Sequence, residues 1–338
     1  MFNIALISRC HPHAKENRYV NQLKDISEAK ITYVWDEDKE RGMQWADELS
    51  VAFEPNFDAL LEKDDVDGIV ITSSTEMHKE IIIKAAKKGK HVFTEKALAM
   101  NYKEALEIKK VVDESGIEFG IVFPRRAKRE YNYAKKLIDN GAFGEISLIR
   151  IRVAVTNLAD LPNAWFMSEA EGGGGGAIRD LSCHTIDLAC WYLGEPESIN
   201  VTKGYIRNHS VEDTGICNIK FKNGAVAVLD SNYAAPLSDN WYTLEIYGSE
   251  MAYIAGTHDV TMIKIDRTKE NPGVQDVIQE VISVNEVDDV ERPLPIQQWI
   301  NAATGQGENL CTIDAGVMVN KVLDAADKAA EENRTVEI

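Results

Sequence analysis

Residues 1–124 alternate between short apolar runs and longer stretches in which apolar positions recur at helical spacing. Nearly every residue of each short run is hydrophobic, which is typical of strands buried on both faces of a parallel sheet. Strands that alternate with helices favour a doubly wound α/β domain with helices on both faces. The predicted strands are residues 2–7, 31–35, 66–71, 91–94 and 118–123, and the predicted helices are 14–26, 39–49, 77–88 and 102–114.

Residues 125–338 have a different pattern. β-rich runs separated by turn signals such as Lys222-Asn223-Gly224 predict a large, open, mostly antiparallel sheet with helices on one side. We therefore expect an α/β domain over 1–124 and an α+β domain over 125–338, with the last helix packing back on the first domain. The predicted strands are 145–156, 198–206, 215–221, 225–232, 243–247 and 260–265, and the predicted helices are 131–140, 177–193, 295–304 and 314–332.

Charge and composition exclude several classes of protein. Among 338 residues there are 37 Lys and Arg against 55 Asp and Glu, a net charge of −18, which disfavours nucleic acid as a partner. No apolar run reaches the ~20 residues of a membrane span, and the first residues lack the features of a signal peptide. The five cysteines are widely spaced and contain no CxxC pair, as in reduced cytoplasmic proteins. We expect a cytoplasmic protein with a small-molecule substrate.

Polar residues follow each predicted strand of the first domain. The carboxyl ends of parallel strands lie at one edge of the sheet, where ligands of doubly wound folds bind. Polar residues commonly end strands because loops are polar, but several such clusters on one edge favour a binding site. The clusters are Ser8, Asp36, Thr72–Thr75, Glu95 with Lys96, and Arg125 with Arg126.

Asp36 ends the second predicted strand, about 25 residues after the first strand–helix turn. A carboxylate at this place accepts hydrogen bonds from both hydroxyls of an adenosine ribose and repels a 2′-phosphate, which favours NAD over NADP. The alternative is that Asp36 caps the following helix.

The first turn lacks the glycine-rich fingerprint expected of a dinucleotide-binding fold. Its spaced positions hold Ser8, Cys10 and His13 instead. Ser8, His11 and His13 are candidate hydrogen-bond donors to a pyrophosphate, and we expect the helix beginning near Ala14 to point its N-terminus at it. A metal site formed by Cys10, His11 and His13 is the rival interpretation, but no fourth ligand has a diagnostic spacing, so we expect no metal.

The predicted helix over 177–193 carries a second group of polar residues. At ~100° per residue, Asp180, His184, Asp187 and Trp191 fall within about 60° of one another. An imidazole between carboxylates exchanges protons near neutral pH. The alternative is a salt-bridged histidine on a solvated face. Lys96, which ends a strand at the binding edge, is a candidate to polarise a substrate oxygen or to form a surface ion pair.

Four segments resemble motifs of the Gfo/Idh/MocA family, the glucose–fructose oxidoreductase and inositol dehydrogenase group. Residues 89–99 are similar to GKHVxxEKPLA, and residues 174–187 are similar to GGGxxxDxGxHxxD. Residues 73–78 and 138–146 match two further motifs, so the similarity covers nearly the whole chain. The chain departs from the family at the glycine-free first turn, at Ala97 in place of proline and at Ser182 in place of glycine.

The resemblance implies a Rossmann domain and an α+β domain whose open sheet forms the interface of a homodimer or homotetramer. It implies NAD(P)-dependent oxidation or reduction of a sugar or polyol, with Lys96, Asp180 and His184 as catalytic residues. Trp165 and Asp187 are expected at the substrate with Lys96 and His184, and Phe166 stands where many members have a basic residue, which disfavours a strongly anionic substrate. The implied cofactor contacts are Ser73, Thr75, His78, Glu95 and Arg126.

We therefore expect an NAD-dependent oxidoreductase that acts on a carbohydrate-like alcohol or ketone. Two alternatives remain open from the sequence. One is an NAD-dependent glycosidase that uses the same residues for transient oxidation and elimination. The other is a non-catalytic dinucleotide-binding sensor, which the missing glycines suggest and the retained Lys96, Asp180 and His184 oppose.

Overall fold

The computed structural model describes residues 1–156, 175–207, 210–235, 241–269, 276–287 and 292–338. The chain divides into two compact units. Among the described residues, the first unit consists of Met1–Pro124 and Pro293–Asn320, and the second consists of the chain between 125 and 292 together with Lys321–Ile338. The first unit therefore includes Pro293–Asn320, which the sequence analysis assigned to the second domain.

The first unit is built on a six-stranded sheet in the order β3-β2-β1-β4-β5-β6. All of its neighbouring strands pair in parallel, so the predicted doubly wound fold is confirmed. The two-residue edge strand β3 was not predicted. The strands are β1 (Phe2–Ile7), β2 (Ala29–Trp35), β3 (Ala52–Phe53), β4 (Gly68–Ile71), β5 (His91–Thr94) and β6 (Phe119–Ile121).

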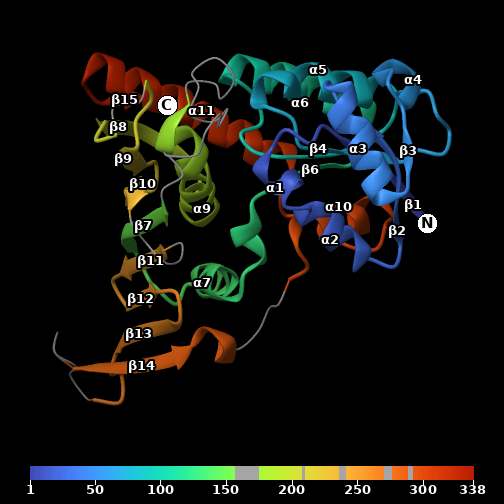
Figure 1. The fold of residues 1–338 in the computed structure, drawn as a ribbon. Coiled ribbons are helices and arrows are strands. Elements are labelled where there is room, and N and C mark those ends of the chain that lie inside the picture. The colour runs from blue at the N-terminus through green and yellow to red at the C-terminus, as the bar shows by residue number, and fades with distance from the viewer. Residues whose placement is uncertain (157–174, 208–209, 236–240, 270–275, 288–291) are drawn as a thin grey trace. The chain divides into compact units, whose positions relative to one another are not determined.

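Helices cover both faces of this sheet, with α5 and α6 on one face and α2 and α10 on the other (Figure 1). Side-chain caps begin several of them: Asp38 accepts hydrogen bonds at the start of α3, and Asn101 accepts one at the start of α6. The helices of this unit are α1 (Pro12–Lys15), α2 (Arg18–Lys24), α3 (Lys39–Leu49), α4 (Phe57–Leu61), α5 (Thr75–Lys87), α6 (Tyr102–Ser115) and α10 (Pro295–Ala303).

The single helix predicted over residues 14–26 is wrong. The segment forms two short helices, α1 and α2, separated at Asn17, whose backbone is left-handed with φ 53°. An i→i−4 hydrogen-bond ladder cannot continue through a left-handed residue, so the helical stretch after β1 is only four residues long. The expected long helix aimed at a pyrophosphate is therefore absent from this turn.

Helix α10 packs on the same core as the parallel sheet, although about 170 residues separate it from β6 along the chain. Trp299 is fully buried, with its ring 5.4 Å from Phe2 and 5.7 Å from Phe93. A side chain at Gly68 or Gly120 would come within 3.0 Å of the Trp299 side chain. The two glycines in the sheet therefore make the space that this indole fills.

The second unit is built on a nine-stranded sheet in the order β14-β13-β12-β11-β7-β10-β9-β8-β15. It is antiparallel apart from the pair β7 and β10, which confirms the predicted mostly antiparallel sheet. Strands β12, β14 and β15 were not predicted. The strands are β7 (Ile146–Thr156), β8 (Pro196–Gly204), β9 (Thr214–Phe221), β10 (Val226–Ala235), β11 (Trp241–Gly248), β12 (Met251–Ala255), β13 (Asp259–Ile265), β14 (Val277–Ser283) and β15 (Val336–Glu337).

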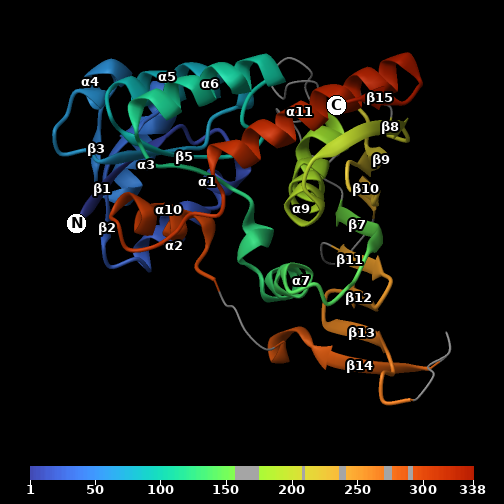
Figure 2. The ribbon, with the colours of Figure 1, turned by 180° about the vertical axis from the view of Figure 1, so that it is seen from behind.

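Helices α7 and α9 lie against one face of this sheet (Figure 2). The Tyr192 hydroxyl of α9 donates to the Tyr131 carbonyl of α7, which ties the two helices together. In the part of the chain that the structure describes, no helix is both long and apolar enough to cross a membrane. The remaining helical elements are η1 (Pro124–Ala127), α7 (Arg129–Asp139), η4 (Ile178–Ser182), α9 (Cys183–Leu193), η5 (Val284–Glu286) and α11 (Ile313–Glu332).

Candidate active site

The carboxyl ends of the first unit's strands lie in register at one edge of the sheet. Ile7 pairs with both Trp35 and Ile71, and Ile71 pairs in turn with Thr94. The residues that follow these strand ends therefore meet at a common edge, as predicted from the parallel pattern. They are Ser8, Asp36, Thr72 and Glu95.

Ser8 occupies the first position of the glycine-free turn with a left-handed backbone, φ 67°. This is the region that glycine adopts without strain and other residues adopt rarely. Its buried hydroxyl donates to Glu37 and accepts from the Cys10 N–H. The turn thus keeps a glycine-like conformation, while the Ser8 hydroxyl is used within the protein.

Asp36 follows β2 and its side chain is fully buried. It accepts hydrogen bonds from the backbone N–H groups of Arg9 and Asp38, and from the Arg41 guanidinium, whose Nη2 lies 2.6 Å from Oδ1. Arg41 also contacts Glu37. The carboxylate predicted to receive ribose hydroxyls is therefore covered by Arg41, whose side chain is 30% exposed and has room to move.

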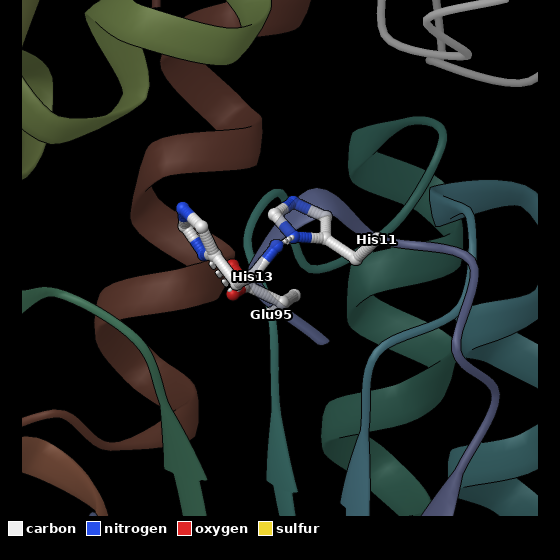
Figure 3. A group of neighbouring side chains, drawn as sticks. All are labelled: His11, His13 and Glu95. Carbon is white, nitrogen blue, oxygen red and sulfur yellow. Dashed lines mark hydrogen bonds and ion pairs between the residues drawn. The ribbon is translucent and has the colours of Figure 1, made fainter. Parts of the chain in front are cut away.

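His11, His13 and Glu95 form a group that we call the first-turn cluster (Figure 3). His13 Nδ1 lies 2.6 Å and His11 Nδ1 3.7 Å from Glu95 Oε1, and the Tyr19 hydroxyl donates to the same oxygen. Burial alone would raise the pKa of Glu95, but the neighbouring His11 and His13, with the hydrogen bond to His13, outweigh it, so the pKa of Glu95 lies well below its ordinary range. Glu95 is accordingly a buried carboxylate that stays ionised.

Three of the predicted cofactor-contacting residues lie at the start of α5, and all are buried: Ser73, Thr75 and His78. Burial lowers the pKa of His78, so its imidazole is neutral. Its Nδ1 then donates to the Ala97 carbonyl, 3.0 Å away, and so ties α5 to the segment after β5. His78 thus has a clear positioning role for the chain beside Lys96.

Lys96 follows Glu95 directly at the end of β5, and only 4% of it is exposed. Its backbone N–H donates to Glu95 Oε2 at 3.3 Å. A buried ammonium group at the ligand-binding edge of a parallel sheet is suited to hydrogen-bonding a substrate oxygen. The surface ion pair considered as the alternative for Lys96 does not describe so buried a residue.

In the second unit, Asp180 lies in a π-helical segment, η4, that runs directly into α9. π-Helical turns are rare and occur often at functional sites. The buried Tyr233 of β10 donates its hydroxyl to Asp180 Oδ2. Burial, and then the charge of Asp180, raise the pKa of Tyr233 well above its usual value, so the phenol remains a donor.

The predicted stripe of Asp180, His184 and Asp187 assumed a regular α-helix throughout. The π turn has more residues per turn, which changes the direction of Asp180 relative to the residues of α9. Asp180 and His184 are both partly exposed, whereas Asp187 is buried. The helix therefore divides the stripe into an accessible pair and a buried carboxylate.

Asp187 forms a two-pronged ion pair with Arg126 of η1, with distances of 2.7 and 3.0 Å. The Arg126 guanidinium also lies 5.2 Å from the centre of the Trp191 ring. Burial raises the pKa of Asp187, and the charge of Arg126 offsets this only in part. The structure thus pairs two residues that were predicted to contact different molecules, the cofactor and the substrate.

Glu212, which the sequence analysis missed, supports the start of this helix. Its Oε1 accepts from the Ile178 N–H at 2.9 Å, and its backbone carbonyl accepts from Ala177. A side chain at Gly176 would come within 2.4 Å of the Glu212 carboxylate, and one at Gly215 of β9 within 2.3 Å of Ile178. The absence of side chains at Gly176 and Gly215 therefore lets the π-helical segment pack closely against Glu212 and β9.

Four residues of these sites were missed by the sequence analysis: Tyr19, Arg41, Glu212 and Tyr233. Only Arg41 had a usable sequence signal, because it lies four residues after Glu37, a spacing that favours ion pairs on a helix. Trp165 and Phe166, which were expected near the substrate, lie outside the described residues.

Comparison with known proteins gives the family. Residues 14–123 match the model of the oxidoreductase family with an NAD-binding Rossmann fold, and residues 131–254 match the GFO/IDH/MocA C-terminal domain. The chain belongs to the Gfo/Idh/MocA family. It is therefore an oxidoreductase with an NAD-binding Rossmann domain, which agrees with the NAD(P)-dependent activity that the motifs implied.

Several named relatives are dehydrogenases. The chain is 29% identical to the scyllo-inositol 2-dehydrogenase (NAD(+)) of Bacillus subtilis (strain 168), over 72% of this chain and 70% of that one. It is 25% identical to the myo-inositol 2-dehydrogenase of Thermotoga maritima, over 73% and 74%. Among solved structures, a levoglucosan dehydrogenase in complex with NADH and levoglucosan has the same fold, with a TM-score of 0.85 at 20% identity, covering 100% of this chain and 99% of that one.

The residues of the first unit fit NAD. The strand order places the ends of β1 and β2 side by side, and an acidic residue follows β2, as in domains that bind the adenosine ribose. The left-handed Ser8 keeps the tight turn that glycine makes elsewhere. In the conformation described here, ribose hydroxyls reach Asp36 only when the Arg41 side chain moves aside.

Proposed function

We propose that this protein oxidises a secondary alcohol of a sugar or polyol to a ketone, or reduces the ketone in the reverse direction. In the oxidation, the substrate carbon loses a hydride and the hydroxyl loses a proton. NAD, when bound, accepts or supplies the hydride. His184 accepts the proton in one direction and returns it in the other, and Lys96 hydrogen-bonds the substrate oxygen as negative charge develops on it.

The observation that carries the proposal is the position of Lys96. It is a buried lysine that directly follows β5, at the edge of the sheet where ligands of this fold bind. His78 donates to the Ala97 carbonyl and Glu95 accepts from the Lys96 N–H, so the backbone that carries the Lys96 side chain is held in place. The names of the inositol and levoglucosan dehydrogenases support a polyhydroxylated substrate.

Within the second unit, we assign Asp180 the task of orienting His184 and favouring its protonated form. The Tyr233 hydroxyl holds one oxygen of Asp180 and favours its ionised form. Both residues are partly exposed, so a substrate can reach them. Asp187, being buried against Arg126, acts in this proposal by positioning Arg126 and Trp191 and not by exchanging protons.

For the cofactor contacts we propose the residues predicted from the strand ends, from the first turn and from the motifs. We propose that Asp36 receives the ribose and that the buried segment at the start of α5 lies along the cofactor. Arg126, with its charge balanced by Asp187, is proposed to lie near the nicotinamide. The full set of proposed contacts is Ser8, His11, His13, Asp36, Ser73, Thr75, His78, Glu95, Lys96 and Arg126.

Turnover with inositols, anhydrosugars and simple polyols tests the proposal, with NADH formation or consumption as the readout. Lys96→Ala and His184→Asn should each lower kcat by about 10²-fold or more, and NADH affinity should stay nearly unchanged in His184→Asn, because His184 is not among the proposed cofactor contacts. Lys110→Ala, which removes a lysine with an exposed side chain, should have no effect. Unchanged turnover in either active-site variant removes that residue from the mechanism, and NADH binding without any turnover favours the sensor.

A second candidate is a reaction without net oxidation, in which transient oxidation assists elimination or hydration. One relative, 29% identical over 238 residues, is the 2,7-anhydro-N-acetylneuraminate hydratase of Escherichia coli (strain K12). The NAD-dependent glycosidase alternative has the same logic. In either case substrate disappears while NADH does not accumulate, whereas the dehydrogenase forms one NADH for each ketone.

We also propose that the protein is a cytoplasmic homodimer or homotetramer that associates through the nine-stranded sheet. Large apolar side chains are exposed on three strands in the middle of this sheet: Ile216 of β9, Val226 of the adjacent β10, and Trp241 of β11, which β7 separates from β10. Sedimentation should give a dimer or tetramer, and Trp241→Arg should shift it toward the monomer. A monomeric wild type would contradict this proposal without affecting the proposed chemistry.

A further inference from the structure

The first-turn cluster gathers three metal-binding side chains from two distant parts of the chain. His11 and His13 flank Pro12 after β1, and Glu95 follows β5. Their potential ligand atoms all lie within 4.8 Å of one another. Figure 3 shows both imidazole rings beside the carboxylate.

The hydrogen bonds fix where the lone pairs of this cluster lie. His11 Nδ1 accepts from the backbone N–H of His13 at 3.1 Å, so this nitrogen carries no proton. The same nitrogen lies 3.7 Å from Glu95 Oε1, which is also a lone-pair donor. His13 Nδ1 lies 2.6 Å from that oxygen and shares a proton with it. A cation bound among the three side chains replaces the shared proton, and His11 Nδ1 binds it by giving up the hydrogen bond from the His13 N–H.

We propose that the first-turn cluster binds one divalent transition-metal ion of the zinc class. Two imidazole nitrogens and a carboxylate oxygen form a ligand set that suits such ions, with bonds of about 2.0–2.2 Å. Two atoms bound to one ion then lie at most about 4.2 Å apart. The 4.8 Å within which the three ligand atoms lie exceeds that distance by less than an ångström. Three protein ligands leave a coordination position for water or an anionic ligand.

The surroundings resemble those of a metal site. Tyr19 donates a hydrogen bond to the carboxylate oxygen that would bind the ion, and Tyr19 is itself buried. Such outer contacts hold ligating carboxylates in place. The His11 and Glu95 side chains are 5% and 0% exposed, while that of His13 is 23% exposed. The site is therefore enclosed on the protein side and open to an ion at His13.

This ligand set differs from the Cys10, His11 and His13 set weighed from the sequence. Among the described residues, the group that can hold a metal contains Glu95 and not Cys10. Glu95 lies 82 positions from His13, so it joins the histidines only because β1 and β5 end at the same edge of the sheet. A cobalt ion reports the difference, because a bound thiolate gives a charge-transfer band that imidazole and carboxylate do not.

The test is a titration of the full-length, chelator-treated protein with Co²⁺ and then Zn²⁺, without dinucleotide. We expect one Co²⁺ per chain, a visible spectrum without a thiolate band, and displacement by Zn²⁺. Cys10→Ser and His258→Gln, which removes an exposed histidine, should bind as the wild type does. Because no cofactor or substrate is present, the result is independent of the proposed dehydrogenase activity.

His13→Gln should weaken Co²⁺ binding at least tenfold, and Tyr19→Phe should weaken it about 10-fold to 100-fold. Glutamine retains a hydrogen-bond donor toward Glu95, and an unchanged urea midpoint confirms that this variant folds. If His13→Gln does not fold, His11→Gln replaces it. Three results would overturn the proposal: no saturable binding by the wild type, binding equal in His13→Gln, or a thiolate band that Cys10→Ser abolishes.

Discussion

Glu95 and Asp187 are both buried carboxylates beside cationic groups, yet their pKa values move in opposite directions. Glu95 lies beside His11, His13 and Lys96, and these neighbours, with the hydrogen bond to His13, lower its pKa in spite of its burial. Asp187 is paired with Arg126 at good distances, and its pKa still rises because burial outweighs one partner. One ion pair does not compensate for the desolvation of Asp187, whereas several neighbouring groups together do so for Glu95.

The largest effect should come from breaking the Asp187 pair. Arg126→Met leaves Asp187 buried without its cation, and we expect the free energy of unfolding to fall by about 3–5 kcal/mol. Urea denaturation monitored by circular dichroism measures this free energy of unfolding. Adding Asp187→Leu to the same chain should restore most of the loss, because no charge is then left buried. A loss below about 1 kcal/mol in the single variant would mean that water reaches Asp187.

The pH dependence of stability should differ in sign between the two carboxylates. The lowered pKa of Glu95 gives stability that is present above its unfolded value, near 4.5, and is lost as the pH falls toward the folded pKa. The raised pKa of Asp187 means that the folded state binds a proton more readily than the unfolded state, so acidification favours folding. The contribution of Asp187 to the free energy of unfolding therefore decreases as the pH rises through its folded pKa.

Unfolding of the wild type, Glu95→Gln and Asp187→Asn between about pH 3 and pH 6 checks this contrast. The stability of the wild type relative to Glu95→Gln should rise with pH. Its stability relative to Asp187→Asn should fall with pH. If the stability differences from Glu95→Gln and from Asp187→Asn changed with pH in the same direction, the pKa values of the two carboxylates would not be shifted in opposite directions.

Asp36 is a third buried carboxylate with a cationic partner, and it is also a proposed cofactor contact. Its oxygens are held by Arg41, so in the proposed cofactor site NAD competes with the guanidinium for them. We expect the wild type to bind NAD(H) more tightly than NADP(H). Asp36→Ala should narrow this preference and Arg41→Ala should widen it, each by roughly tenfold, or about 1.4 kcal/mol. Calorimetric titration of both cofactors measures it, with Lys39→Ala on the exposed side of α3 as the control.

A further effect on stability concerns Ser8, which combines a left-handed backbone with a hydroxyl that forms two hydrogen bonds. Ser8→Ala keeps the left-handed φ and loses both hydrogen bonds, so we expect a loss of about 1–2 kcal/mol. Ser8→Gly relieves the strain while losing the same bonds, so its stability should stay within about 0.5 kcal/mol of the wild type. Equal losses in the two variants would argue against strain at this position. Thermal unfolding at fixed pH compares them.

Features governed by local pattern were predictable from the sequence. The apolar runs gave the parallel sheet, and parallel strands alone require that the residues after β1, β2, β4 and β5 share an edge. Contacts between distant residues were not predictable. Arg126 and Asp187 are 61 positions apart, and nothing near either residue indicates its partner.

Two departures from regular helix geometry also escaped prediction. Asn17 breaks the expected helix without a proline or glycine to mark the break. The π turn at η4 depends on Glu212 and on the space left by Gly176 and Gly215, which belong to the tertiary structure. Helix propensity depends on the residues of the segment itself, so it cannot predict a break or a π turn that is imposed by contacts with other segments.

The contact between Ile178 and Gly215 has a consequence for how this chain can diverge. A methyl group at 215 would overlap the Ile178 side chain, so a mutation to alanine there is tolerated only after position 178 has become smaller. The order of the two changes matters, because the reverse order passes through a chain whose π turn is displaced. Positions 178 and 215 should therefore vary as a pair among descendants of this sequence, with a fixed order in which the two substitutions accumulate.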